Sequence, residues 1–320
     1  MNLNRLYKML LMKNKDKMVN HKFELAISIL VHENCEFVNL QFKNIRKFYP
    51  NALVIIHVSE FFWKHKKNEI TKIADNYNVI INPKHFKTGW CSPSIFNAMI
   101  SNKLILNEFQ DWTHYIFLSS NELFYKNKFE DIFKFNNKDF EYPKVYQFQE
   151  NIFNFNYLHN EAHYNDRRFD INYLKILNDY NLDICISGCD YGRLMNRKSF
   201  ELILNLIIKY NFFMADISFQ KHYSQSELII PTLLYLLEQN KSLIIEKSIH
   251  FVYWPSEYEI AKKSQEVILF KHVNRNIHDS FVKKIMNDIG ITYNTNLFQN
   301  LNTLFPEIKR RISNTFNKYF

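Results

Sequence analysis

The sequence predicts an α/β fold in which a mostly parallel sheet is flanked by helices. The chain has 320 residues and is 47% hydrophobic, which is enough for a sizeable core. Short continuous apolar runs, typical of buried parallel strands, alternate with longer segments whose apolar residues recur at helical spacing. We find no internal repeat and no linker rich in Pro, Gly or Ser, so one catalytic-sized domain is expected.

The first unit along the chain is a strand, a helix and a second strand. Residues 25–31 are continuously apolar and end at His32, which indicates a buried strand. Apolar residues then recur at helical spacing as far as Phe48, and Pro50 stops the helix. Residues 53–58 form the second buried run. This pattern is the building block of a parallel sheet.

Later segments continue the alternation, and they set the expected domain limits. Further strands are expected at residues 79–81, 115–118, 144–149, 184–188 and 244–254. Helices are expected at residues 95–108, 197–210 and 226–239. Residues 151–179 lack a clear period, and we interpret them as an insertion over the sheet face. We therefore expect an N-terminal extension (1–23), the α/β domain (24–280) and a C-terminal helical, basic amphipathic extension (281–320).

The composition argues against several classes of protein. The chain has four glycines and neither a P-loop nor a G-x-G-x-x-G fingerprint, so a bound nucleotide would be held by side chains and strand ends. The four cysteines form no C-x-x-C pair, which indicates free thiols in a reducing compartment. No apolar run of about 18 residues and no signal-peptide pattern is present, so we expect a cytoplasmic protein.

The net charge of +9 suits a partner that carries phosphate or other anions. The cations are spread along the chain, and the aromatics lie mostly in apolar periods, which disfavours nucleic acid. Residues 305–320 place apolar groups at roughly helical spacing between cations. Such a helix could rest on the anionic inner face of the cytoplasmic membrane, or it could pack on the body as a solvated terminal helix.

A polar cluster follows the strand that ends at Leu118. Its residues are Ser119, Ser120, Asn121 and Glu122. Because open α/β sheets bind ligands just outside the carboxyl ends of their strands, this cluster is typical of a pocket floor, although an ordinary solvated turn is the alternative. It holds one acid rather than an Asp-x-Asp pair, so we predict no required divalent cation and no other cofactor.

A carboxylate stands in the first turn of the helix expected at 226–239. Glu227 could complement the helix dipole beside a capping serine, which is the plain structural interpretation. It could also act as a general base where a strand-end cleft meets the helix start.

Two cations, Lys271 and Arg275, follow the last expected strand. Together they could hold a diphosphate without a metal, although a solvated basic edge is the alternative. His250 and Trp254 could face the same pocket, but a lone histidine on an apolar strand is more often a satisfied core group.

Taken in order, these segments resemble the core-2/I-branching N-acetylglucosaminyltransferase and peptide xylosyltransferase family (glycosyltransferase family 14) and its bacterial relatives. The family's Ala-His, Ile-His-Val-Asp and Trp-Gly-x-x-Ser patterns correspond to Val31-His32, Ile56-His57-Val58-Ser59 and Trp90-Cys91-Ser92-Pro93-Ser94. Its Leu-Ser-Gly-Gln-Asp, Gly-Ser and Asp-Glu-x-x-x-x-Thr patterns correspond to residues 118–122, Ser187-Gly188 and Ser226-Glu227 through Thr232. The departures include Ser59, which replaces the acid, as well as Cys91, Ser120 and the reversed Ser187-Gly188.

The resemblance implies a GT-A-type fold that transfers a sugar from a nucleotide donor, expected to be a UDP-sugar, with inversion and without a metal. It implies that Glu227 is the general base and that Lys271 and Arg275 stabilise the departing diphosphate. The other expected donor-binding residues are His32, His57, Trp90, Ser94, Ser119, Gly188 and His250. The expected acceptor-binding residues are Asn121, Glu122 and Trp254.

The resulting hypothesis is an inverting glycosyltransferase of bacterial surface polysaccharide synthesis, such as lipopolysaccharide or capsule. Its partners would be a nucleotide-sugar, a glycan or lipid-linked oligosaccharide acceptor, and an anionic membrane. The missing acid at Ser59 keeps open an inactive sugar-binding or scaffolding relative, and the basic charge keeps open a nucleic-acid-binding protein.

Overall fold

The computed structural model describes twelve stretches of the chain. They are residues 23–32, 34–89, 92–109, 112–126, 145–147, 171–182, 184–186, 194–212, 225–239, 252–263, 268–271 and 273–291.

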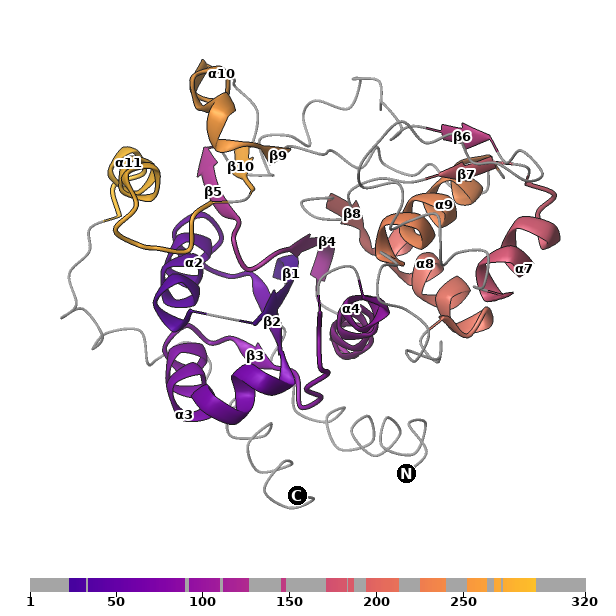
Figure 1. Ribbon diagram of the computed structural model, residues 1–320, viewed down its shortest axis with the longest axis horizontal. Coiled ribbons are helices and arrows are strands. Elements are labelled where there is room, and N and C mark those ends of the chain that lie inside the picture. The colour runs from indigo at the N-terminus through magenta and orange to yellow at the C-terminus, as the bar shows by residue number, and fades with distance from the viewer. Residues whose placement is uncertain are drawn as a thin grey trace.

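A five-stranded sheet with the order β3-β2-β1-β4-β8 forms the centre (Figure 1). Its strands are β1 (Phe23–Val31), β2 (Leu53–Val58), β3 (Ile80–Ile81), β4 (Trp112–Leu118) and β8 (Leu194–Asn196). The first four strands of this order are mutually parallel, and β8 runs antiparallel to β4. The predicted α/β fold with a mostly parallel sheet is confirmed.

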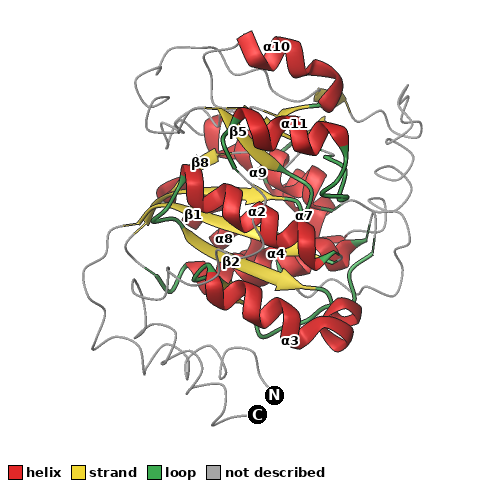
Figure 2. Ribbon diagram, turned by 90° about the vertical axis from the view of Figure 1, so that its left-hand side faces the viewer, coloured by secondary structure: helices red, strands yellow, loops and turns green. Residues whose placement is uncertain are grey.

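Helices cover both faces of this sheet (Figure 2). One face of β1 and β2 packs against α2 (Cys35–Phe48) and α3 (Glu60–Asn76), for example through Ile29 and Phe42. The other face packs against α4 (Pro93–Leu106), and α8 (Arg197–Lys209) and α9 (Ser226–Gln239) belong to the same buried cluster. Both faces are buried, which explains why β1 and β2 have continuous apolar sequences rather than alternating ones.

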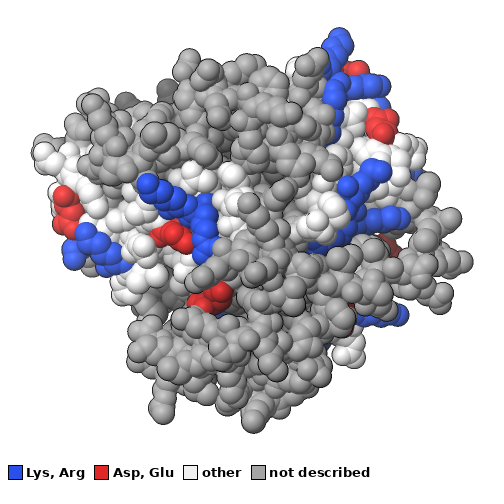
Figure 3. All heavy atoms as spheres, turned by 180° about the vertical axis from the view of Figure 1, so that it is seen from behind, with Lys and Arg blue, Asp and Glu red and all other residues white. Residues whose placement is uncertain are grey.

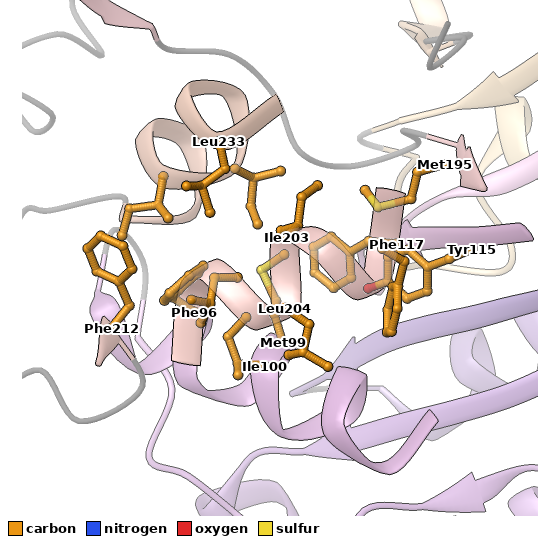
Figure 4. Close-up of a cluster of buried hydrophobic side chains, with 14 of the residues drawn as sticks. Phe96, Met99, Ile100, Tyr115, Phe117, Met195, Ile203, Leu204, Phe212 and Leu233 are labelled. Carbon is orange, nitrogen blue, oxygen red and sulfur yellow. The ribbon is translucent and has the colours of Figure 1, made fainter. Parts of the chain in front are cut away.

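The layer on the second face is the larger hydrophobic core. Figure 4 shows Phe96, Met99 and Ile100 of α4 meeting Ile203 and Leu204 of α8. The same view places Leu233 of α9 across from α4, and Tyr115 and Phe117 at the sheet. The helix α9 is therefore anchored in the core by its apolar side chains.

A smaller sheet with the order β5-β10-β9 continues the fold beyond β4. Its strands are β5 (Leu123–Lys126), β9 (Val252–Tyr253) and β10 (Ile268–Phe270). They are followed or flanked by the 3-10 helix η3 (Pro255–Glu257), α10 (Tyr258–Lys263) and α11 (Ser280–Asp288). A third buried cluster joins Phe37 of α2, Phe270 of β10 and Ile285 of α11. The first helix beyond the predicted boundary at residue 280 thus packs on the domain.

Several elements were not expected from the sequence. The helix α3 and the short strands β5 and β8 lie where none was predicted. Part of the presumed insertion, Ile171–Asp179, is the helix α7, which buries Tyr173, Ile176 and Leu177 at helical spacing. The remaining short strands, β6 (Val145–Gln147) and β7 (Ile184–Ile186), pair antiparallel. Residues 1–22, 151–170 and 292–320 lie outside the described residues.

Candidate functional site

The candidate site lies where the strand order of the central sheet changes direction. Strands β2 and β3 lie on one side of β1, and β4 lies on its other side. In open α/β sheets, the crevice outside the carboxyl ends of the strands at such a switch point is the usual ligand site. Ile29 pairs with Leu118 in parallel, so His32 and the segment after β4 share this edge.

The turn after β4, residues 119–122, is held by its own side chains and by α2. The Glu122 carboxylate accepts the backbone N–H of Ser119 at 2.9 Å, and the Ser119 hydroxyl donates to Asn121 Oδ1 at 2.8 Å. The side-chain amide of the buried Gln41 donates to the carbonyls of Ser119 at 2.8 Å and Glu122 at 2.9 Å. Asn121 and Glu122, predicted to bind the acceptor, are buried and shape the turn.

The loop after β10 is tied to both neighbouring strand ends. The backbone N–H of Val273 donates to the carbonyl of Asn121 at 3.1 Å. The side-chain amide of Asn34 donates to the carbonyl of Arg275 at 2.7 Å. Asn34 has a left-handed backbone (φ 57°) and its Oδ1 accepts the N–H of Phe37, so it also caps α2. These contacts place Arg275 at the switch point.

The guanidinium of Arg275 contacts groups on both strands of the switch point. Its Nη2 lies 3.3 Å from Nε2 of His32 and 3.4 Å from the hydroxyl of Ser120. The side chain of His32 is exposed and that of Arg275 is half-buried. The contact with Nε2 needs a neutral imidazole protonated on Nδ1, because guanidinium only donates. The structure thus brings together two predicted donor-binding residues, His32 and Arg275.

Lys271 and Trp254 follow a neighbouring pair of strand ends. Strands β9 and β10 are parallel, with Tyr253 paired to Phe270, so the next residues along each strand are Trp254 and Lys271. Trp254 is 50% exposed, and its backbone N–H donates to Glu257 Oε2 at 2.7 Å. Lys271 is half-buried. A cation and an exposed aromatic ring therefore occupy adjacent positions in the register.

His57, predicted to bind the donor, is fully buried at the end of β2. Its Nε2 accepts the backbone N–H of Phe86 at 2.9 Å, and the two rings stack at 5.5 Å between centroids. Burial, with a smaller contribution from the charge of His85, lowers the pKa of His57 to about 3. The neutral imidazole organises the segment after β3. Ser94 is also buried, and its hydroxyl lies 2.8 Å from that of Ser92, the cap of α4.

Glu227 lies in the first turn of α9 and is half-buried. Further along this helix, the hydroxyl of Thr232 lies 3.1 Å from that of Tyr173 and is buried. The convergence of Glu227 with Lys271 and Arg275 stays a prediction. The other predicted site residues, Trp90, Gly188 and His250, lie outside the described residues.

Sequence reasoning missed Asn34 and Gln41, which position the site without facing a ligand. Each had a recognisable signal. Gln41 is a polar residue on the mostly apolar, buried face of α2, where an amide needs a partner. Asn34 directly precedes the helix, where asparagine is a favoured cap and tolerates positive φ.

Phosphate is the group that the described cations could hold. Arginine offers a fork of donors and lysine a point charge, and both suit phosphate oxygens. Among the residues that the structure describes, no group of three or more His, Cys, Asp or Glu could hold a metal ion. Within the same residues, no helix has the length and apolar character needed to cross a membrane.

The chain is similar in structure to solved structures of other proteins. No protein-family model and no curated sequence matches the chain. The structure is similar to that of an active-site mutant of LgtC, a glycosyltransferase, with a TM-score of 0.36 and 11% identity, covering 89% of this chain and 99% of that one. A TM-score this low carries no functional argument, so the function is argued from the chain's own topology and contacts.

Proposed function

We propose that the chain is a glycosyltransferase of the GT-A type, which binds the diphosphate of a nucleotide-sugar at the switch point. The observation that supports this is the position of the Arg275 guanidinium, 3.3 Å from His32 and 3.4 Å from Ser120, at the carboxyl edges of β1 and β4. A fork of cationic donors at the usual ligand position of an open α/β sheet suits a phosphate-bearing ligand.

The proposed reaction is transfer with inversion of the anomeric configuration. Glu227 takes the proton of an acceptor hydroxyl while that oxygen attacks the anomeric carbon and the bond from this carbon to the diphosphate oxygen breaks. Lys271 and Arg275 stabilise the negative charge that develops on the leaving diphosphate. General-base catalysis contributes roughly 10²–10⁴-fold to the rate. In this proposal the two cations perform the task for which other transferases use a metal.

The proposed donor is a UDP-sugar, and the proposed acceptor is a glycan or a lipid-linked oligosaccharide at the inner face of the bacterial cytoplasmic membrane. The donor assignment rests on the family resemblance of the six sequence motifs, and the acceptor assignment rests on the basic amphipathic pattern of residues 305–320. The exposed Trp254 next to Lys271 supports a carbohydrate partner, because an aromatic ring offers a flat apolar face to a sugar.

Binding of UDP by isothermal titration calorimetry, with EDTA present, tests the proposal. We expect the wild-type chain to bind, and Arg275→Ala to lose at least about tenfold in affinity because a charge-assisted contact to phosphate is removed. Lys198→Ala, an exposed cation on α8, is the matched control and should bind like wild type. Absence of UDP binding, or equal binding by Arg275→Ala, would contradict the donor site.

Hydrolysis of a panel of nucleotide-sugars then separates an enzyme from an inactive relative. The inactive alternative is motivated by Ser59, which is buried at the end of β2 and whose N–H donates to Val31 at 2.8 Å, where the family has an acid. An inactive relative would bind UDP but release no sugar from any donor, whereas a transferase hydrolyses its own donor slowly.

The distribution of charge on one face of the described surface does not favour the nucleic-acid alternative. On the face shown in Figure 3, described Lys and Arg side chains stand beside Asp and Glu side chains rather than in one basic band. Ion pairs of the described residues include Arg197 with Glu201 at 2.7 Å and Lys284 with Glu259 at 3.4 Å. A nucleic-acid groove needs cations grouped along one path.

A further inference from the structure

The start of α3 presents aromatic side chains to solvent. Phe61 is 72% exposed, the largest exposed fraction among the large apolar side chains of the described residues. Its ring lies 4.4 Å from that of His65 between centroids. Trp63 is half-buried and stacks on His85 at 4.2 Å, with an angle of 18° between the rings. The rings therefore form two aromatic pairs at the surface.

The side chain of Phe61 does not belong to the face of α3 that packs on the sheet, whereas the half-buried Trp63 also packs against that core. The buried residues of this helix are Phe62, Ile70, Ile73 and Ala74. Lys66 has a non-helical backbone (φ −128°, ψ 15°), so residues 60–65 form a short segment before the kink. A helix needs only its buried stripe for folding, so the stability of the core does not account for an exposed Phe61.

Cations surround the aromatic pairs. Residues 60–88 contain six lysines, three acids and no arginine. The ammonium of Lys67 lies 5.6 Å from the centre of the Trp63 ring. Lys64 pairs with Glu60 and Lys66 with Glu69 at 3.0 Å, both between side chains that are largely exposed, so these pairs are weak and can reopen. The surface combines net positive charge with apolar rings.

We call this surface the α3 patch, and it consists of Phe61, Trp63, Lys64, His65, Lys67 and His85. It lies at the same edge of the sheet as the candidate site. The helix α3 starts two residues after β2, and Val58 at the end of β2 pairs with Val31, the residue before His32. Figure 2 shows α3 alongside the tip of β2.

We propose that the α3 patch binds an anionic lipid surface and so presents the switch-point site to acceptors held in that surface. Lysine stems and aromatic rings together suit the boundary between head groups and acyl chains, where rings insert and ammonium groups meet anionic head groups. The net positive charge of residues 60–88 complements such a surface. The role in presenting acceptors rests on the proposed function, but lipid binding itself does not.

Co-sedimentation of the full chain with vesicles tests the inference. Wild type should sediment with vesicles rich in phosphatidylglycerol and not with pure phosphatidylcholine. Lys67→Glu should weaken this binding about fivefold or more, since one cation near an anionic surface is worth about fivefold in affinity. Phe61→Ser should also weaken it, because the ring that inserts at the acyl boundary is lost. The matched controls lie on α10: Ile260→Ser, 64% exposed in wild type, and Lys263→Glu should bind like wild type.

Three outcomes would overturn the inference. The first is that the wild-type chain does not bind anionic vesicles. The second is that the α10 control variants lose as much vesicle binding as the α3 variants. The third is a change of oligomeric state or of RNA binding, rather than of vesicle binding, in the α3 variants, which would assign the patch to another partner. UDP binding is measured separately, without vesicles. Lipid binding by the α3 patch and nucleotide binding at the switch point can then fail independently of each other.

Discussion

The side-chain amide of Asn34 donates a 2.7 Å hydrogen bond to the backbone carbonyl of Arg275, across 241 positions of the chain. The same side chain accepts the N–H of Phe37 at the start of α2. One residue therefore joins the end of β1, the first turn of a helix and the loop that carries the candidate phosphate ligand.

This hydrogen bond predicts that Asn34→Asp lowers the affinity for UDP but changes the free energy of unfolding little. Aspartate keeps the capping oxygen and tolerates positive φ, so the free energy of unfolding should change by less than about 1 kcal/mol. It cannot donate to Arg275, so affinity for UDP should fall about tenfold, which corresponds to the loss of one hydrogen bond. Calorimetric titration and chemical denaturation measure the two effects.

Asn34→Gly provides the neutral control for the added charge of aspartate. Glycine keeps the left-handed conformation but lacks both hydrogen bonds, so UDP affinity should fall in this variant too. Unchanged affinity in Asn34→Gly would show that Asn34 does not position Arg275.

His57 predicts a loss of stability on acidification. Its pKa is about 3 in the folded chain, against an ordinary value of 6.5 that applies to the unfolded chain. Between these values the unfolded chain binds a proton that the folded chain does not, so stability falls as the pH falls, with a slope of up to about 1.4 kcal/mol per pH unit. Urea denaturation at pH 7, 6, 5 and 4 measures this slope.

The variant His57→Gln should reduce that slope, because glutamine can accept the N–H of Phe86 but does not titrate in this range. His278→Gln, at an exposed position, should leave it unchanged. Identical slopes in the wild type and His57→Gln would mean that other groups govern the acid response.

Gln41→Leu should destabilise the turn after β4. The carbonyls of Ser119 and Glu122 would lose the donor that now lies at 2.8 and 2.9 Å, and a buried acceptor without a partner costs about 1–3 kcal/mol. Denaturation curves should show that loss. Lys47→Ala, exposed on the same helix, should stay within about 0.5 kcal/mol of wild type, and a similar effect in both variants would argue against the role of Gln41.

Glu227→Gln tests the proposed general base. The variant should lose roughly 10²–10⁴-fold in transfer rate because glutamine cannot take the acceptor's proton. Its affinity for UDP should remain, since the carboxylate is not proposed to touch the diphosphate. Near-normal transfer by Glu227→Gln, followed with a radiolabelled donor, would remove this residue from the mechanism.

The sequence predicted the elements that repeat a strong local pattern. The strand β2 and the helix α9 have the predicted limits, because a continuous apolar run and a helical apolar period identify them without tertiary information. The strands β5 and β8 were missed because each has only three or four residues and depends on pairing with a distant partner. The first turns of α3 were missed because their exposed aromatic and basic side chains obscure the helical period.

For the candidate site, the sequence predicted where polar residues would follow the strands, and the roles of these residues stay predictions. His32 and Arg275 are brought together as expected. Asn121 and Glu122 were predicted to bind the acceptor, and this stays a prediction. Their hydrogen bonds include contacts within the turn, with the loop after β10 and with Gln41 of α2. A sequence shows that polar groups follow a strand, but their partners depend on how distant segments pack.

The attachment of the Arg275 loop to Asn34 and Asn121 has a consequence for synthesis of the protein. The ribosome makes the strands of the parallel sheet long before residue 275 emerges, so a nascent chain can form the crevice without the guanidinium that is to fill it. Under the proposed function, nucleotide binding that requires this cation starts only when the loop docks on the two strand ends.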